Sequence, residues 1–497
     1  MELNKKIFKI DNILIFATAI IILLGIIIRT KLLFLNPSFW FDTYALAINL
    51  DSSYNNLFKP LSCLQVAPPL FLVISKFLYN LFYAGGSFES KDFILRLVPY
   101  FCGVLSLPLF SLLLHKAFHN IIFTLLGTFI LSFNICAINY TIEYKQYSCE
   151  MLCSIILLLI FYSIKIKDIS TKNLIYTSIA FTIIPWFSNS AWIILSLGLL
   201  YLLVNLIINK SKDIRIFTIL FIPFFINLFI FYNYFYSPIM EQNYIFMSKY
   251  WGHSIPSFFN TENFLKMFPD KVNNLLPLFS NNFFWLFLCT NIFFLFFNEN
   301  IKNIFFILSP IGITILASFF DMYPFQDRLV LFLLPCFIML YIQFLSILKE
   351  KKILNYIVIF SIFVLTIKNL SIPIETYITH KSITRDLFYT LKKENPELKN
   401  IIAHNSIFPY QSNGKDYIYD NMYIPFKYSK IPTYIQTLNP DKYWIFAPCG
   451  NKDYMNNLFL FLESNKRIKK LRIYYPPQKK WGIVETEKQA FIAEFEL

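Results

Sequence analysis

The sequence predicts an α-helical polytopic membrane protein with a smaller α/β domain at its C-terminal end. Hydrophobic residues make up 56% of the 497 residues, and charged residues only 15%. The apolar residues gather in repeated runs rich in Ile, Leu and Phe, close to the roughly 20 residues with which a helix crosses about 30 Å of hydrocarbon. Helices are expected because a chain in lipid must satisfy its own backbone hydrogen bonds.

About eleven runs have the length and apolarity of membrane spans. No small-residue cleavage site follows the first, so we expect a retained anchor. The predicted spans are 13–28, 97–114, 121–139, 149–164, 174–187, 190–208, 215–235, 283–297, 303–320, 329–347 and 353–370. A further run, 68–83, begins with Pro68 and Pro69 and holds Lys76 near its middle. We predict that it lies along the membrane interface as a helix and does not span.

The basic residues lie in the short segments between these spans. With Lys5, Lys6 and Lys9 inside, the basic clusters all fall on the same side as the N-terminus: 115–120, 165–173, 209–215, 298–303 and 349–352. Short cytoplasmic loops collect Lys and Arg, so we predict a multi-pass inner (plasma) membrane protein with a cytoplasmic N-terminus. This placement explains the net charge of +14 without a nucleic-acid partner.

Three regions of substance are left on the outer side. They are a first outer loop at 30–95, a later one at 236–282, and everything after about 370. The last region alternates strand-like stretches (400–404, 442–448, 470–475 and 490–497) with helix-like ones (382–398 and 452–470). We therefore predict a transmembrane module at 1–370 and an extracytoplasmic α/β domain at 371–497.

Charged side chains at the outer ends of the spans are the candidates for chemistry. Asp42 stands just after the first span and before the helix-like TYALAINL. A local interpretation is a helix N-cap, since Asp accepts hydrogen bonds from the first free backbone N–H groups. Other outer segments near the membrane carry a small set of matching charges: Arg96, Glu143, Lys145, Asp327 and Arg328.

Five motifs occur in an order that resembles a known family. They are FWFD (39–42), QVAPPLF (65–71), ILRLVPYFCGVLSLPLF (94–110), IEYKQYS (142–148) and YPFQDRLVLFLLP (323–335). The chain is similar to bacterial GT-C glycosyltransferases, and more narrowly to the family-39-like group of protein O-mannosyltransferases and lipid A aminoarabinose transferases. That group usually shows an acidic pair at the first motif. Here Thr43 follows Asp42, so the role of the second carboxylate is in doubt or falls to Glu143.

The resemblance implies a GT-C fold and transfer of a sugar from a polyprenyl-phosphate carrier to an extracytoplasmic glycan, lipid or protein. Asp42 would be the general base, and direct attack would invert the anomeric centre. Glu143 would orient the acceptor or the neighbouring cation. The leaving phosphate needs cations and no carboxylic acid, because its pKa is low. Phosphate-binding candidates are Lys145, Arg328 and Arg96; substrate-binding candidates are Tyr44, Gln65, Tyr147 and Gln326.

Each assignment has an alternative. Arg96 could anchor a span at the headgroups, Glu143 could pair with Lys145, and Arg328 with Asp327. No metal-ligand spacing appears, so no cofactor is assigned and a divalent metal stays open. Cys63 and Cys449 could form a disulfide outside the cytoplasm. The rival functions are a transporter or flippase for lipid-linked sugars, which would place ionisable groups within its spans, and a membrane scaffold.

Overall fold

The computed structural model describes residues 2–347 with gaps, and the strands beyond. The gaps are 38, 40, 84–87, 165–168, 210–212, 242–260, 277–287, 289–300 and 321; beyond 347 the described residues are 401–403, 443–447, 460, 463–464, 470–474 and 492–496. The chain divides into two compact units. The first consists of Met1–Phe34, Asn49–Ala84 and Ile94–Ser371, and the second of Leu35–Ile48, Gly85–Phe93 and Ile372–Leu497.

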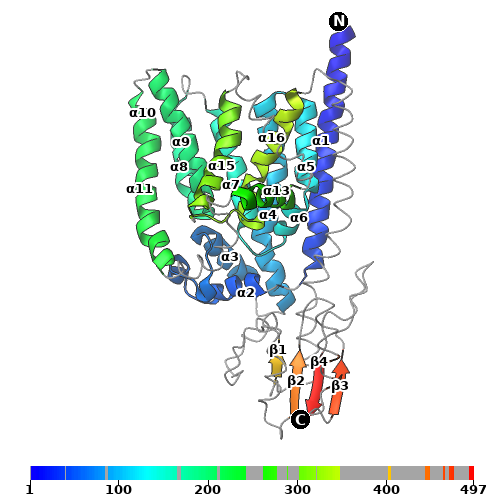
Figure 1. The fold of residues 1–497 in the computed structure, drawn as a ribbon. Helices are drawn as coiled ribbons and strands as arrows, with labels where there is room; N and C mark the ends of the chain where they lie inside the picture. Colours follow the sequence, from blue (N-terminus) through cyan, green and yellow to red (C-terminus); the bar gives the residue numbers. More distant parts are fainter. Residues whose placement is uncertain are drawn as a thin grey trace. The chain divides into compact units, whose positions relative to one another are not determined.

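Helices dominate the chain up to residue 347 (Figure 1). They are α1 (Glu2–Leu35), α2 (Phe41–Ala47), α3 (Pro69–Phe82), α4 (Phe88–Phe118), α5 (Ile121–Phe133), α6 (Ile135–Thr141), α7 (Tyr147–Ser163), α8 (Thr171–Phe187), α9 (Ala191–Ile208), α10 (Ile214–Ile216), α11 (Ile222–Phe231), α13 (Thr261–Leu275), α15 (Ile301–Phe319) and α16 (Leu334–Ile347). Two π-helices, η5 (Phe217–Phe221) and η6 (Tyr232–Tyr236), continue α10 and α11, and short 3-10 helices are η1 (Ile48–Asp51), η2 (Tyr54–Phe58), η3 (Ser62–Leu64) and η7 (Asp327–Leu333).

The prediction of a many-pass helical membrane protein is confirmed. Within the described residues, six helical stretches are long and apolar enough to cross a membrane: Asp11–Leu35, Ser90–Phe118, Ala191–Ile208, Ile214–Glu241, Lys302–Phe319 and Arg328–Ser346. A seventh exists if α5 and α6, bent by 54°, count as one broken span. The predicted spans at 149–164 and 174–187 are helices of 17 residues each, α7 and α8. The predicted spans at 283–297, apart from residue 288, and at 353–370 lie outside the described residues.

The break between α5 and α6 is built on Asn134. Its backbone is extended, and its side-chain oxygen accepts from the backbone N–H of Ala137, which caps α6. Its side-chain nitrogen donates to the carbonyl oxygen of Leu275, at the end of α13, over 2.9 Å. The bend is therefore held from both sides by one amide.

Arg29, near the end of α1, is fully buried. Its guanidinium donates to the carbonyl oxygens of Ser132 (2.8 Å) and Leu131 (3.2 Å), and to that of Gly25 one turn back (3.0 Å). The last carbonyls of a helix such as α5 have no intrahelical partner and carry the negative end of its dipole. The cation therefore fastens α1 to α5 at the point where α5 ends.

The ambiguous run at 68–83 forms α3, a helix of 14 residues. At 1.5 Å per residue it measures about 21 Å, which is too short to cross the hydrocarbon. Lys76 is buried, and its ammonium donates to the carbonyl oxygens of Leu50, over 2.5 Å, and Ser52. It also lies 5.2 Å from the centre of the Tyr54 ring. Helix α3 packs against α8 and lies below it in Figure 1.

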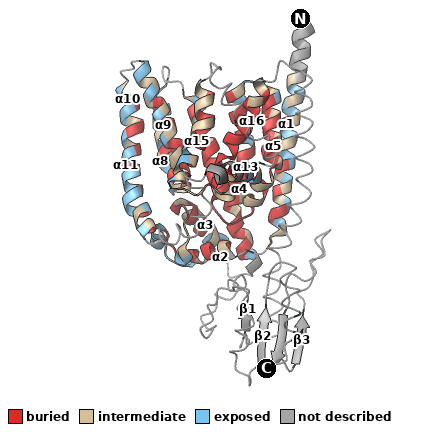
Figure 2. Cartoon of the chain, in the orientation of Figure 1, coloured by how far each residue is buried: buried red, intermediate tan, exposed pale blue. Residues whose placement is uncertain are grey.

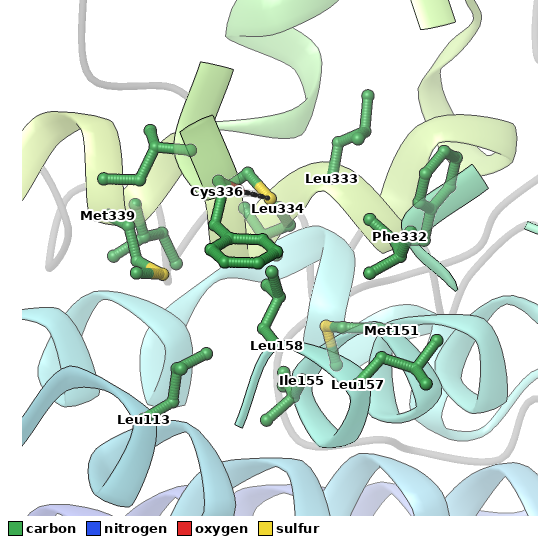
Figure 3. Packing of buried hydrophobic residues seen from close by; sticks show 14 of the residues in the cluster. Leu113, Met151, Ile155, Leu157, Leu158, Phe332, Leu333, Leu334, Cys336 and Met339 are labelled. Carbon is green, nitrogen blue, oxygen red and sulfur yellow. Dashed lines mark hydrogen bonds between the residues drawn. The ribbon is translucent and has the colours of Figure 1, made fainter. Parts of the chain in front are cut away.

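The centre of the first unit is densely buried, whereas the outward faces of α8, α9 and α11 are exposed (Figure 2). Exposed residues on α11 include Phe225, Ile226 and Phe229, which suits a lipid-facing surface. In the core, Met151, Ile155 and Leu158 of α7 face side chains of η7 and α16 (Figure 3). Because η7 packs along α7, the turn that precedes α7 and the residues that precede η7 are both held in fixed positions.

Helix α9 approaches α7 closely at Gly198. A β-carbon at this position would lie 2.0 Å from ring carbons of Phe161. Gly198→Ala is expected to destabilise the chain by about 1–3 kcal/mol, because the ring must leave its packed position. Thermal unfolding in detergent measures this. The matched control is Gly312→Ala on α15, where a β-carbon would meet nothing within 4 Å. Equal unfolding temperatures for the two variants would contradict the prediction.

In the second unit, strands form at all four predicted stretches. They are β1 (Ile401–Ala403), β2 (Tyr443–Ala447), β3 (Lys470–Tyr474) and β4 (Ile492–Glu496), in the order β1-β2-β4-β3. The β1–β2 pair is parallel, with Ile402 opposite Phe446, and the other two pairs are antiparallel. Aromatic and β-branched residues supply the pairing faces. The predicted helix at 382–398 lies outside the described residues, and that at 452–470 is described as helix only at 460 and 463–464.

Candidate active site

The motif IEYKQYS forms a buried turn between two helices. Residues 142–146 join the end of α6 to the start of α7, and the Lys145 N–H donates to the Glu143 carbonyl over 2.7 Å. Glu143 is only 5% exposed and Lys145 only 4%. Two oppositely charged side chains are thus held inside the protein by a short irregular segment, and such burial of charge is typical of functional sites.

The turn contacts the motif QVAPPLF of the first unit. The Lys145 ammonium donates to the side-chain oxygen of Gln65 over 2.6 Å. The side-chain nitrogen of Gln146 donates to the carbonyl oxygen of Val66 over 3.4 Å. At the end of the same motif, the ring of Phe71 stacks on that of Tyr144 with centroids 5.4 Å apart. Two motifs that are 80 residues apart in the chain are therefore side by side.

Arg328 and Tyr147 bring the last motif to the same place. The guanidinium carbon of Arg328, on η7, lies 5.9 Å from the centre of the Tyr147 ring, in a cation–π contact. The Tyr147 ring packs edge-on against Tyr140, with centroids 5.3 Å apart. The Tyr140 hydroxyl lies within electrostatic range of both Glu143 and Arg328. Glu143, Tyr147 and Arg328 thus share one neighbourhood.

Arg96 lies on α4 and is 2% exposed. Its Nε donates to the carbonyl oxygen of Ile142, the first residue of the turn, over 2.7 Å. One of its donors therefore positions the turn rather than facing a ligand. Gln326 is the extended residue before η7, and its carbonyl accepts from the Leu329 N–H over 2.8 Å. The side chain of Asp327 lies outside the described part, so its pairing with Arg328 stays a prediction.

Asp42 and Tyr44 belong to the second unit. Asp42 is partly exposed and is the second residue of α2, so it lies inside the first turn and not at the N-cap position. Tyr44 is buried, and the Lys91 ammonium lies 6.0 Å from the centre of its ring. Asp42 is predicted to lie close to Glu143, Lys145 and Arg328. Because these three residues belong to the first unit, that closeness stays a prediction.

Two functional candidates were not predicted. Glu150, in the first turn of α7, is 4% exposed, and the described residues give its carboxylate neither a hydrogen bond nor an ion pair. Tyr323 donates its hydroxyl to the Leu329 carbonyl over 2.6 Å. Burial raises the pKa of the Tyr323 phenol well above its usual value, and the charge of the nearby Glu150 raises it further. The spacing of Glu150, three residues after Tyr147 on a helix, was the available signal.

No metal site is formed by the described part of the chain, in which no three His, Cys, Asp or Glu side chains lie close enough together. Cys63 is exposed, and Cys449 lies outside the described residues, so their disulfide stays a prediction. The charged groups brought together in the first unit are a carboxylate and two cations among aromatic rings. This set suits the recognition of an anion beside a reacting hydroxyl.

The fold has a solved counterpart. The structure of ArnT from Cupriavidus metallidurans bound to undecaprenyl phosphate aligns with a TM-score of 0.52 over 97% of both chains, at 9% sequence identity. The chain has the ArnT fold. Since aminoarabinose transferases are among the proteins that the sequence resembles, the expected GT-C type of fold is confirmed. At this identity the likeness to ArnT shows the fold alone.

A second structure is similar over part of its length. The oligosaccharyltransferase of Archaeoglobus fulgidus in the apo form aligns with a TM-score of 0.48 at 13% identity, over 76% of this chain and 58% of that chain. No protein-family model matches the sequence, and neither does any curated protein.

Proposed function

We propose that the chain is a glycosyltransferase that moves a sugar from a polyprenyl-phosphate carrier to an acceptor hydroxyl on the extracytoplasmic side. The observation that carries the proposal is the buried turn at 142–146, which holds Glu143 and Lys145 and runs directly into Tyr147, whose ring is in contact with Arg328. The ArnT fold supports it, since the ArnT structure holds undecaprenyl phosphate.

The phosphate of the donor is the part that this site suits best. Lys145 supplies a compact charge, whereas the planar guanidinium of Arg328 can bind two phosphate oxygens at once. The Tyr147 ring contacts the guanidinium through a cation–π interaction. As the sugar leaves, negative charge grows on the phosphate, and both cations stabilise it. The leaving group needs no proton, so one carboxylate is enough for acid–base work.

Asp42 is the proposed base. In the proposed step its carboxylate takes the proton of the acceptor hydroxyl while the oxygen attacks the anomeric carbon from the side opposite the phosphate, which inverts the configuration. Glu143 orients the acceptor or the neighbouring Lys145, and Arg96 holds the turn through the Ile142 carbonyl. Gln65, Tyr44, Tyr147 and Gln326 are the proposed contacts to the substrates.

The test is a transfer assay with the full chain in liposomes. The donor is polyprenyl phosphate carrying radiolabelled mannose, glucose or galactose, and the acceptor is a cell-envelope extract. We expect label to appear in the extract and bare polyprenyl phosphate to accumulate. Movement of the intact labelled lipid across the bilayer, without loss of its sugar, would instead support the flippase alternative. A chelator added to the same assay tests for a divalent metal.

A further inference from the structure

Helix α7 carries a line of buried polar side chains that the proposed mechanism does not use. Glu150 and Ser154 are four residues apart on α7, and Gln146, the N-cap residue with helical backbone angles, stands four residues before Glu150, so the three side chains lie on one face. Their exposed fractions are 8%, 4% and 1%. Within the described part of the chain, the side-chain oxygens of Gln146 and Ser154 have no hydrogen-bond partner. The Glu150 carboxylate has none among the described residues.

Gln146 presents an acceptor and not a donor. Its side-chain nitrogen donates to the Val66 carbonyl over 3.4 Å, which leaves the oxygen as the free end of the amide. Glu150, one turn further along, offers two more acceptor oxygens when it is ionised. A buried acceptor without a partner costs free energy, and a buried carboxylate costs more. A ligand that donates hydrogen bonds to the oxygens of both Gln146 and Glu150 would therefore lower the free energy of the protein.

The position of this face of α7 indicates which part of the substrate would bind there. Tyr147 lies between the two residues and, being three residues before Glu150, on the same side of α7. Its ring carries the guanidinium of Arg328, to which the donor phosphate is assigned. The sugar of a polyprenyl-phosphate donor is bonded directly to that phosphate, so its hydroxyl groups are the nearest hydrogen-bond donors that the substrate brings.

We propose that Gln146 and Glu150 form a sugar subsite, in which their oxygens accept hydrogen bonds from hydroxyl groups of the sugar on the donor. This inference rests on the proposed function, because it needs the phosphate at Arg328. Glu150 touches the substrate through non-reacting hydroxyls, so it sets affinity and sugar choice and takes no part in proton transfer.

The experiment compares two ligands that differ only by the sugar. Affinity of the full-length protein in detergent is measured for bare polyprenyl phosphate and for the same carrier loaded with mannose, glucose or galactose. Wild type is expected to bind at least one loaded carrier more tightly than the bare one. In Glu150→Leu this preference is expected to fall roughly two- to tenfold, the usual effect of losing one hydrogen bond. Affinity for the bare carrier should be unchanged.

Stability separates a ligand-binding role from a structural one. Glu150→Leu is expected to unfold at the same or a higher temperature than wild type, because it removes a buried carboxylate that has no partner. Glu150→Gln keeps the shape and one acceptor oxygen and should retain part of the preference. The matched control is Ser148→Ala, another buried polar residue, whose unpartnered hydroxyl lies about 200° round the helix from Gln146. It should leave the preference intact.

The outcomes distinguish the two proposals. If wild type does not bind bare polyprenyl phosphate at all, the proposed function fails. If it binds the carrier but prefers none of the sugar-loaded forms, or if Glu150→Leu keeps the full preference, the subsite is wrong and the proposed function stands.

Discussion

Asp42→Asn is expected to lower the rate of sugar transfer by a factor of about 10²–10⁴, the usual contribution of a positioned general base. Asparagine keeps the size and most hydrogen bonds of the side chain but cannot take up the acceptor proton. The fall should appear in kcat, and affinity for the donor should stay as in wild type, because the donor phosphate is assigned to Lys145 and Arg328. Single-turnover transfer with a labelled donor, alongside donor binding, measures both quantities.

The matched control is Asp51→Asn, a second carboxylate in the predicted first outer loop, which is exposed at the end of η1. It should transfer sugar at the wild-type rate. Undiminished transfer by Asp42→Asn would remove Asp42 as the base and leave Glu143 as the remaining predicted catalytic carboxylate. If Asp42 acts only on the dipole of α2, its variant should lose stability and keep its rate.

The second large effect is expected at Arg328. Arg328→Ala should weaken binding of bare polyprenyl phosphate by roughly 10- to 100-fold, because a two-pronged charge-assisted contact to the phosphate is lost. Arg328→Lys keeps the charge but not the planar fork that lies on Tyr147, and should fall between wild type and Arg328→Ala. Equilibrium binding of the carrier in detergent measures the series.

A surface arginine provides the control for this series. Arg215 is exposed and pairs with Asp213 over 2.7 Å, and Arg215→Ala should bind the carrier as wild type does. If Arg328 serves only as an ion-pair partner of Asp327, then Arg328→Ala and Arg328→Lys will both keep wild-type affinity for the carrier. That result would move the phosphate site to Lys145 alone.

The helical membrane fold could be predicted because lipid imposes long apolar runs, and the four strands because aromatic and β-branched residues alternate with turns. The start of α4 was placed wrongly. The apolar pattern predicts a span that starts at residue 97, because the charged residues Lys91, Asp92 and Arg96 come before it. The helix in fact begins at Phe88, and the three charged residues are each 2% exposed. Their burial depends on partners elsewhere in the chain, such as the Tyr44 ring near Lys91.

Some residues of the candidate site could likewise be predicted from the sequence, and one could not. The motif order indicated that Gln65, Lys145 and Arg328 belong to one region, and the Lys145–Gln65 bond and the Arg328–Tyr147 contact place them around one turn. Glu150 escaped notice, because an acidic residue in the first turn of a helix is common and favoured by the helix dipole. Its burial depends on the segments that pack against α7, such as η7, α8 and α9, and no local sequence pattern predicts such packing.

The hydrogen bonds of the Arg29 guanidinium impose an order on the steps by which the helices enter the membrane during synthesis. Its carbonyl partners in α5 lie 102 and 103 residues further along the chain, so they are synthesised after α1 has already entered the bilayer. Until they arrive, the long side chain must reach toward the lipid headgroups and their water. The first helix therefore settles to its final depth only once the fifth has been inserted, and a truncated chain that ends before Leu131 should hold its N-terminal anchor at a different height.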